Sequence, residues 1–152
     1  MSNSKVVKID YNKTTNNYLN ESTFGERLRK SRIDLNMTME EVASLCGVTK
    51  SVINGYELNR CYPSIQVLEL LSKKFNLCYL CKDGYTKTIL NHKTFIENIN
   101  TWIDTNNLTQ QEAADKLGVS RSILKFWFNG SVIRSSTYYK ILENLNKYNL
   151  IW

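Results

Sequence analysis

Apolar residues along this chain recur mostly at the spacing of one face of an α-helix, as in Ile65, Leu68, Leu71 and Phe75. Short polar stretches with helix-capping residues separate these runs. The pattern predicts helices at 24–35, 50–57, 95–106, 110–117, 121–128 and 136–147, a helix between Thr38 and Gly47, and a helix that starts after Ser64. The predicted fold class is therefore mainly α.

Capping residues mark the ends of these predicted helices. In a capping box, a Thr hydroxyl accepts a hydrogen bond from the backbone three residues on, and a Glu at that position accepts one from the Thr backbone. Thr23 with Glu26, Thr38 with Glu41 and Thr109 with Glu112 have this spacing. We also expect N-caps at Thr49, Ser64, Ser120 and Ser135, and helix ends at Gly47, Asn59 and Gly130.

Two parts of the chain repeat one another at an offset of 71 residues, without a gap. The repeat predicts two similar helical modules, residues 23–76 and 94–152, preceded by a polar arm, 1–22, and joined by a connecting segment, 77–93. The paired identities are Thr23/Thr94, Phe24/Phe95, Glu26/Glu97, Asn36/Asn107, Thr38/Thr109, Glu41/Glu112, Ala43/Ala114, Gly47/Gly118, Val48/Val119 and Ser51/Ser122.

The connecting segment has β-prone runs on both sides of Asp83 and Gly84, which favours a short β-hairpin. A plain linker is the alternative. Because an isolated hairpin is marginally stable, we expect it to pack on a module, or to pair with a second chain or with a short strand at residues 6–9. The rest of the arm is polar and is expected to be mobile.

Charge and composition narrow the class of function. A net charge of +6 and a pI of about 9.1 favour an anionic partner. No apolar run approaches the ~20 residues of a membrane helix, and no signal peptide is visible, so we expect a cytoplasmic protein without membrane contact. No phosphate-binding loop and no catalytic motif is present, so we expect no enzyme.

Cysteine spacing gives only a weak metal signal. Cys78 and Cys81 have the spacing of half a zinc site, but the second half is missing, and Cys46, Cys61 and the single histidine, His92, are isolated in the sequence. We expect reduced structural cysteines and no metal ion or cofactor.

Each repeat meets the packing needs of a helix-turn-helix. Two helices that cross on a tight turn need a small residue at the crossing, a glycine in the turn, and apolar residues on the inner side of the second helix. A generic helical hairpin is the alternative, and two copies in register argue against it. The residues in these places are Ala43, Gly47, Val48, Ile53 and Tyr56, and in the second repeat Ala114, Gly118, Val119, Leu124 and Trp127.

Both repeats resemble the Cro/repressor (XRE) helix-turn-helix family. The resemblance rests on the segments 37–43, 47–49 and 56–59 in the first repeat, MTMEEVA, GVT and YELN, and on 108–114, 117–122 and 127–130 in the second, LTQQEAA, LGVSRS and WFNG. It implies two tandem lambda-repressor-like modules. Members of this family bind duplex DNA, usually as dimers, to control transcription.

The resemblance also implies an ion pair between Arg32 in the first helix and Glu57 at the end of the third. The second repeat has Ile103 and Phe128 at these positions. Because both partners are apolar in the second repeat, we expect hydrophobic packing to replace the ion pair there, without leaving an unpaired buried charge.

Two departures from the family pattern bear on binding. Met39 stands where the family often has a glutamine that contacts a phosphate, whereas the second repeat retains Gln110. Phe126 stands at an outward position of the second repeat, where the first has Gly55. An outward aromatic side chain can meet thymine methyl groups or belong to a protein interface.

In this motif the start of the third helix faces base edges in the major groove, where Asn54 can pair with adenine and Lys50 or Arg121 with guanine. Ordinary solvated polar residues are the alternative. The predicted DNA contacts are Thr49, Lys50, Ser51, Asn54 and Arg60, then Gln110, Ser120, Arg121, Ser122 and Lys125, with backbone contacts from Lys5, Lys8 and Lys13.

The function expected from these features is sequence-specific binding of double-stranded DNA by a homodimeric transcriptional regulator, more a repressor than an activator, of bacterial or phage origin. Either both repeats read half-sites, or the first reads DNA and the second dimerises the protein. The alternative function is a protein-binding module on the same fold, an antitoxin or a phage-encoded inhibitor of a host enzyme. Phe126, the predicted hairpin and the modest charge favour that alternative.

Overall fold

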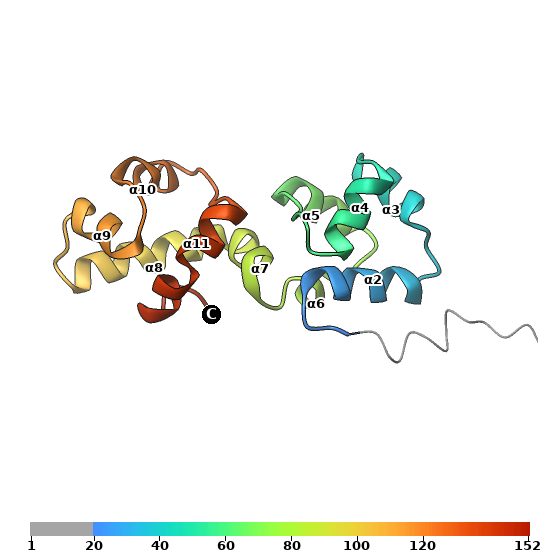
Figure 1. Cartoon of the computed structure of the whole chain (residues 1–152), viewed down its shortest axis with the longest axis horizontal. Coiled ribbons are helices and arrows are strands. Elements are labelled where there is room, and N and C mark those ends of the chain that lie inside the picture. The colour runs from blue at the N-terminus through green and yellow to red at the C-terminus, as the bar shows by residue number, and fades with distance from the viewer. Residues whose placement is uncertain (1–19) are drawn as a thin grey trace, which may run out of the picture. The chain divides into compact units, whose positions relative to one another are not determined.

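The computed structural model describes residues 20–152 (Figure 1). The strand predicted at 6–9 and the backbone contacts predicted at Lys5, Lys8 and Lys13 lie outside the described residues. The chain divides into two compact units, the first ending at Leu80 and the second running from Cys81 to Trp152. Within residues 20–152 both units consist of helices and connecting turns, without a strand.

The helices follow the two repeats. In the first unit they are α2 (Phe24–Asp34), α3 (Met39–Cys46), α4 (Lys50–Glu57), α5 (Ile65–Leu71) and α6 (Leu77–Leu80). In the second unit they are α7 (Gly84–Leu90), α8 (His92–Thr105), α9 (Gln110–Leu117), α10 (Arg121–Phe128) and α11 (Ser135–Lys147).

Most predicted caps are present. Thr23, Thr38 and Thr109 each form a capping box with the Glu three residues on. Ser64 and Ser120 accept hydrogen bonds from the backbone N–H groups of Val67 and Ile123. These local bonds satisfy donors that a helix start leaves unpaired, which explains why the helix starts could be predicted closely.

One predicted capping bond and two predicted helix starts need correction. Thr49 occupies the N-cap of α4, but its side chain makes no capping hydrogen bond. Ser135 is the first residue of α11, and Arg134 is its N-cap. Helix α8 begins at His92, before the predicted start at residue 95, because the chain turns directly from α7 into α8 at Asn91.

The predicted hairpin at 77–93 is wrong, because this segment forms α6 and α7. Asn76 caps α6 by accepting a hydrogen bond from the backbone N–H of Tyr79, and buried Arg27 donates from Nε to the carbonyl of Leu80 at 3.0 Å. In α7, Thr88 donates its hydroxyl to the carbonyl of Gly84, and buried Ile89 anchors the helix. These local and tertiary contacts together override the β propensity of Thr, Tyr and Ile, which depends strongly on context.

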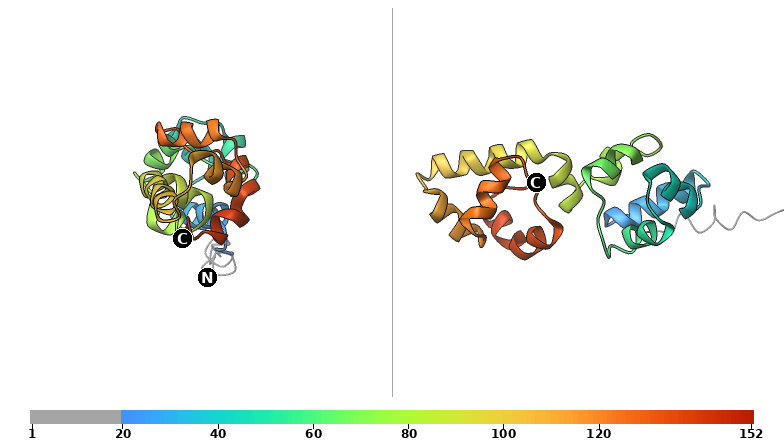
Figure 2. Two further views of the ribbon diagram at one scale, coloured as in Figure 1. Left: turned by 90° about the vertical axis from the view of Figure 1, so that its left-hand side faces the viewer. Right: turned by 90° about the horizontal axis from the view of Figure 1, so that it is seen from above.

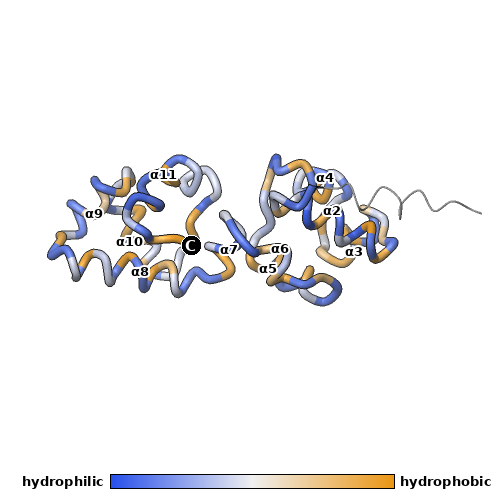
Figure 3. The backbone as a smooth tube through the Cα atoms, turned by 90° about the horizontal axis from the view of Figure 1, so that it is seen from below, coloured by the Kyte–Doolittle hydropathy of each residue, from blue (hydrophilic) through white to orange (hydrophobic). Residues whose placement is uncertain are grey.

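Each unit has its own apolar core. Figure 3 shows hydrophobic and hydrophilic positions alternating along α8, and in Figure 2 α9, α10 and α11 lie along one side of this longest helix of the second unit. Burying one such side chain contributes roughly 1.5–3 kcal/mol. Fully buried core residues include Leu28, Val42, Ile53, Leu68 and Leu71 in the first unit, and Phe95, Ile99, Leu117, Leu124 and Leu145 in the second.

One polar contact, buried in the first unit and half-buried in the second, has a counterpart in each unit and was not predicted. Arg27 holds the carbonyl of Leu80, at the end of the first unit. The position equivalent to Arg27 in the second unit is Asn98, whose side-chain amide donates to the carbonyl of Leu150 at 3.3 Å. In both units the first helix of the repeat therefore anchors the last residues of the unit.

His92 has no such partner. Both of its ring nitrogens are buried without a hydrogen bond among the described residues, and its ring lies 6.3 Å from that of Phe95, between centroids. Burial lowers the pKa of His92 below its ordinary value of 6.5, since desolvation disfavours the charged imidazolium. Neutral His92 is therefore the form that the folded second unit accommodates.

We predict that the second unit loses stability as the pH falls below 6.5, because the unfolded chain then binds a proton that the folded unit resists. The stability that neutral His92 contributes is fully present above that pH and is lost progressively below it. Urea unfolding followed by tryptophan fluorescence reports this unit alone, since Trp102, Trp127 and Trp152 all belong to it.

The control is the variant His92→Phe, which should have the same urea midpoint at pH 7 and at about pH 5. The carboxyl groups of Glu40, Glu41 and Glu112 do not interfere, because their pKa values lie below 4.5. An equal loss of stability in wild type and His92→Phe would contradict the prediction.

Candidate nucleic-acid interface

Each unit contains a helix pair of helix-turn-helix form, α3 with α4 and α9 with α10. Gly47 and Gly118 end α3 and α9 with φ of 65° and 83°, a left-handed conformation that glycine adopts without a steric penalty. Ala43 and Ala114 are buried within the first helix of each pair. In each pair the turn presents the start of the second helix to solvent.

The start of α4 carries a compact set of exposed polar side chains. Thr49, Lys50 and Ser51 are consecutive and exposed, whereas Asn54, one turn further on, is half-buried. Arg60 is exposed in the turn after α4. The structure thus brings the first three predicted contacts together at one helix end, with Asn54 beside them and Arg60 beyond the other end of the helix.

Lys50 forms an ion pair that the sequence did not predict. Its Nζ lies 2.6 Å from Oε1 of Glu40, in the first turn of α3, and both side chains are exposed. The hydrogen bond from Lys50 is the largest of the effects that lower the pKa of Glu40. Exposed pairs contribute little to stability, so Lys50 can exchange this carboxylate for a phosphate or a guanine edge at little cost.

The second unit presents a corresponding set on α9 and α10. Gln110 is exposed at the first position of α9, and the hydroxyl of Ser120 caps α10. Arg121 has no ion pair among the described residues, because the position equivalent to Glu40 is Gln111, which binds Asp115 at 2.9 Å. Ser120, Arg121, Ser122 and Lys125 are all exposed.

The ion pair predicted from the resemblance is present in the first unit. Arg32 donates from Nε and Nη2 to the two carboxylate oxygens of Glu57, at 2.5 and 3.0 Å, and from Nη1 to the carbonyl of Met37 at 3.0 Å. The side chains are only 11% and 2% exposed. Arg32 therefore ties the end of α4 to α2 and to the turn that enters α3. In the second unit Ile103 and Phe128 are both half-buried.

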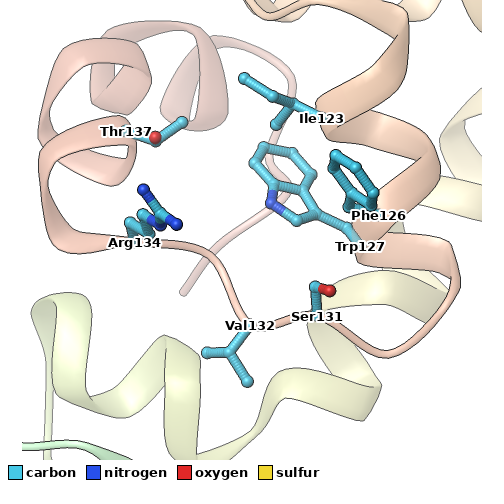
Figure 4. Close-up of a pocket in the computed structure, with 7 residues that line it drawn as sticks. All are labelled: Ile123, Phe126, Trp127, Ser131, Val132, Arg134 and Thr137. Carbon is cyan, nitrogen blue, oxygen red and sulfur yellow. The ribbon is translucent and has the colours of Figure 1, made fainter.

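Phe126 is the one departure from a polar face on α10. Its side chain is 60% exposed, and it borders an open hollow of about 450 Å³ between α10, the following loop and the start of α11 (Figure 4). Nothing in the sequence beyond the outward aromatic indicated this hollow. Its lining residues are Ile123, Phe126, Trp127, Ser131, Val132, Arg134 and Thr137.

The part of the chain that the structure describes has neither a metal-binding cluster nor a membrane-spanning helix. No group of three or more His, Cys, Asp or Glu side chains there could hold a metal ion. No helix within residues 20–152 is long and apolar enough to cross a membrane.

The two crossed helix pairs, each with exposed polar residues at the start of its second helix, define a helix-turn-helix protein. A helix-turn-helix family model matches residues 28–80 and again residues 102–152. The chain belongs to the helix-turn-helix family of the Cro/repressor (XRE) type, a DNA-binding family, and carries two tandem copies. Searches of curated proteins and of solved structures each gave no significant match.

Proposed function

We propose that this chain is a sequence-specific, double-stranded DNA-binding transcriptional regulator that reads bases mainly with the start of α4. The observation that carries the proposal is the exposed run of Thr49, Lys50 and Ser51 at that helix end, held out by a helix-turn-helix. Hydroxyl groups and the free backbone N–H groups of a helix start suit phosphate oxygens, and a lysine suits a guanine edge or a phosphate.

The proposed mode of action is repression by a homodimer that occupies its operator, in a bacterium or a phage. A dimer would bring two copies of α4 to half-sites about one helical turn apart, roughly 34 Å. Arg121 and its neighbours on α10 would add a second reading element on each chain. The overall positive charge of +6 supports attraction to the duplex.

The experiment that tests the proposed function is selection from a random pool of duplex oligonucleotides at near-physiological salt, followed by sequencing. One two-part motif would support a dimeric or tandem reader, and its half-site spacing would distinguish the two. A single short motif would assign base reading to one unit alone. Bulk binding without an enriched motif would contradict sequence-specific regulation.

With a selected duplex in hand, we predict that Lys50→Ala combined with Asn54→Ala weakens binding by about 30-fold or more, since two base contacts are lost and each contributes about 1–3 kcal/mol. The chain should stay folded, because Lys50 is exposed and Asn54 is half-buried. Fluorescence anisotropy gives the affinity, and circular dichroism checks the fold.

The matched control is Lys73→Ala, which removes one exposed positive charge outside α4. It should change affinity less than twofold and should leave motif preference intact. Equal weakening by Lys73→Ala and by the double variant would mean that charge alone governs binding. An unchanged affinity in the double variant would remove α4 as the reader.

A further inference from the structure

The hollow beside α10 is lined by residues of the second unit, and several of their equivalents in the first unit differ. In the first unit the position of Phe126 is taken by Gly55, and a Cβ placed there would lie 2.7 Å from Sγ of Cys61. Cys61 therefore folds back against α4, where its thiol donates to the carbonyl of Val52. In the second unit the phenylalanine occupies that space, and Val132 stands at the position of Cys61, 37% exposed.

The residues that line the hollow are of the kinds that bind a protein side chain. Figure 4 shows Ile123, Trp127 and Phe126 on the α10 side, with Arg134 and Thr137 on the α11 side. Trp127 lines the hollow with the small part of its side chain, 4%, that is exposed. A volume of about 450 Å³ can receive one large side chain with its flanking backbone. Aromatic residues with an arginine at the edge are also the residues that dominate binding energy at protein interfaces.

The charge that lines the hollow is positive. Among the described residues that line it, Arg134 is the one charged side chain. The stretch 121–142, which contains α10, the loop and most of α11, carries Arg121, Lys125, Arg134 and Lys140 and no Asp or Glu. A partner that fills the hollow is therefore favoured if it carries carboxylates beside its apolar residue.

We propose that this hollow docks a segment of another protein that presents a large apolar side chain flanked by acidic residues. The apolar side chain would lie against Trp127, Ile123 and Phe126, and a carboxylate would pair with Arg134. Duplex DNA fits less well, because a major groove offers only base edges and thymine methyl groups to an open apolar hollow. A second copy of this chain would bring like charges together.

Docking there would also affect DNA binding by α10. Phe126 follows Ser122 by one helical turn, so the two side chains lie on neighbouring parts of the same exposed face. A segment seated over Phe126 would cover part of the surface that α10 would turn toward a duplex. Partner binding and contact of α10 with DNA would then exclude one another, while α4 in the first unit would remain accessible.

The test is selection of binders from a random peptide library displayed on phage, with the full chain as bait. Enriched peptides are synthesised, and their affinities are measured by fluorescence polarisation. We expect peptides with an aromatic residue or leucine beside Asp or Glu. Their binding should weaken by about tenfold or more in Phe126→Ala and in Arg134→Glu. Both changes lie on the exposed surface, so circular dichroism should be unchanged.

Two matched controls separate the hollow from general effects. Leu58→Ala removes another exposed apolar side chain, 47% exposed, in the first unit. Lys93→Glu reverses another exposed positive charge near a helix start, as Arg134→Glu does. Both controls should bind the selected peptides within about twofold of wild type.

Several results would overturn the proposal. One is the absence of enriched peptides, or enrichment of peptides that bind Phe126→Ala as well as wild type. Another is self-association of the chain in sedimentation that Phe126→Ala abolishes, which would make a second copy the occupant. A third is loss of affinity for a selected duplex in Phe126→Ala without any peptide binding, which would assign the surface to DNA. None of these results depends on whether α4 reads bases.

Discussion

Replacing Arg32 with Leu is expected to destabilise the first unit by about 3–5 kcal/mol, because it leaves the carboxylate of Glu57 buried without its partner. That side chain is only 2% exposed, so water cannot replace the two hydrogen bonds from the guanidinium. The loss also frees the carbonyl of Met37 at the entry to α3. Since small units have a stability of only about 5–15 kcal/mol, much of the first unit's stability would be lost.

The second unit supplies the compensating change. The double variant Arg32→Ile with Glu57→Phe copies Ile103 and Phe128, and we expect it to recover at least half of the lost stability. An apolar pair leaves no stranded charge, and such replacements are often neutral or better. Far-UV circular dichroism during urea unfolding follows both units, whereas tryptophan fluorescence follows only the second.

The fluorescence transition is the internal control for this pair of variants and should stay at the wild-type midpoint. A loss below about 1 kcal/mol in Arg32→Leu would show that the pair behaves like an exposed one. The double variant could instead lose as much unfolding free energy as the two single variants lose together. That result would contradict the equivalence of the charged and apolar pairs.

Helix starts were predictable from the sequence because capping is local chemistry. A Thr or Ser and the backbone N–H it accepts from are three residues apart, so the printed sequence already contains both partners. The helix-turn-helix pairs followed for the same reason, since Gly47 and Gly118 meet a local need for a left-handed residue. The capping box and the glycine end of α3 are repeated in α9.

Features set by distant partners were not predictable in this way. In the connecting segment, the end of α6 is held by Arg27, 53 residues away in the sequence, which donates to the carbonyl of Leu80. The hollow beside α10 is completed by the following loop and by α11, which the spacing of residues in α10 does not reveal. The pairing of Lys50 with Glu40 depends on the crossing of α3 and α4, which the spacing of residues does not give.

The position of α4 in the first unit depends on one glycine, Gly25. We expect Gly25→Ala, which adds a single methyl group, to be among the substitutions that destabilise this unit most. A Cβ at this position would lie 2.2 Å from the carbonyl oxygen of Tyr56 and 2.7 Å from that of Glu57. Both obstacles are backbone, so α2 and α4 would have to move apart. The shift would also strain the hydrogen bond from the Gly25 N–H to Oδ1 of Asn59, which is 3.1 Å long.

Such overpacking costs about 1–3 kcal/mol or more, and each kcal/mol lowers the Tm of a unit this small by roughly 4–8 °C. Gly55→Ala is the matched control, because its Cβ would meet only Sγ of Cys61, a side chain that can rotate away. Differential scanning calorimetry should show a large drop for Gly25→Ala and a small one for Gly55→Ala, in the transition of the first unit. Equal drops would mean that α2 and α4 separate easily. In that case the close approach at Gly25 would not be what holds Thr49, Lys50 and Ser51 in place, and the geometry of the proposed reading helix would have to come from α3 and the Arg32–Glu57 pair alone.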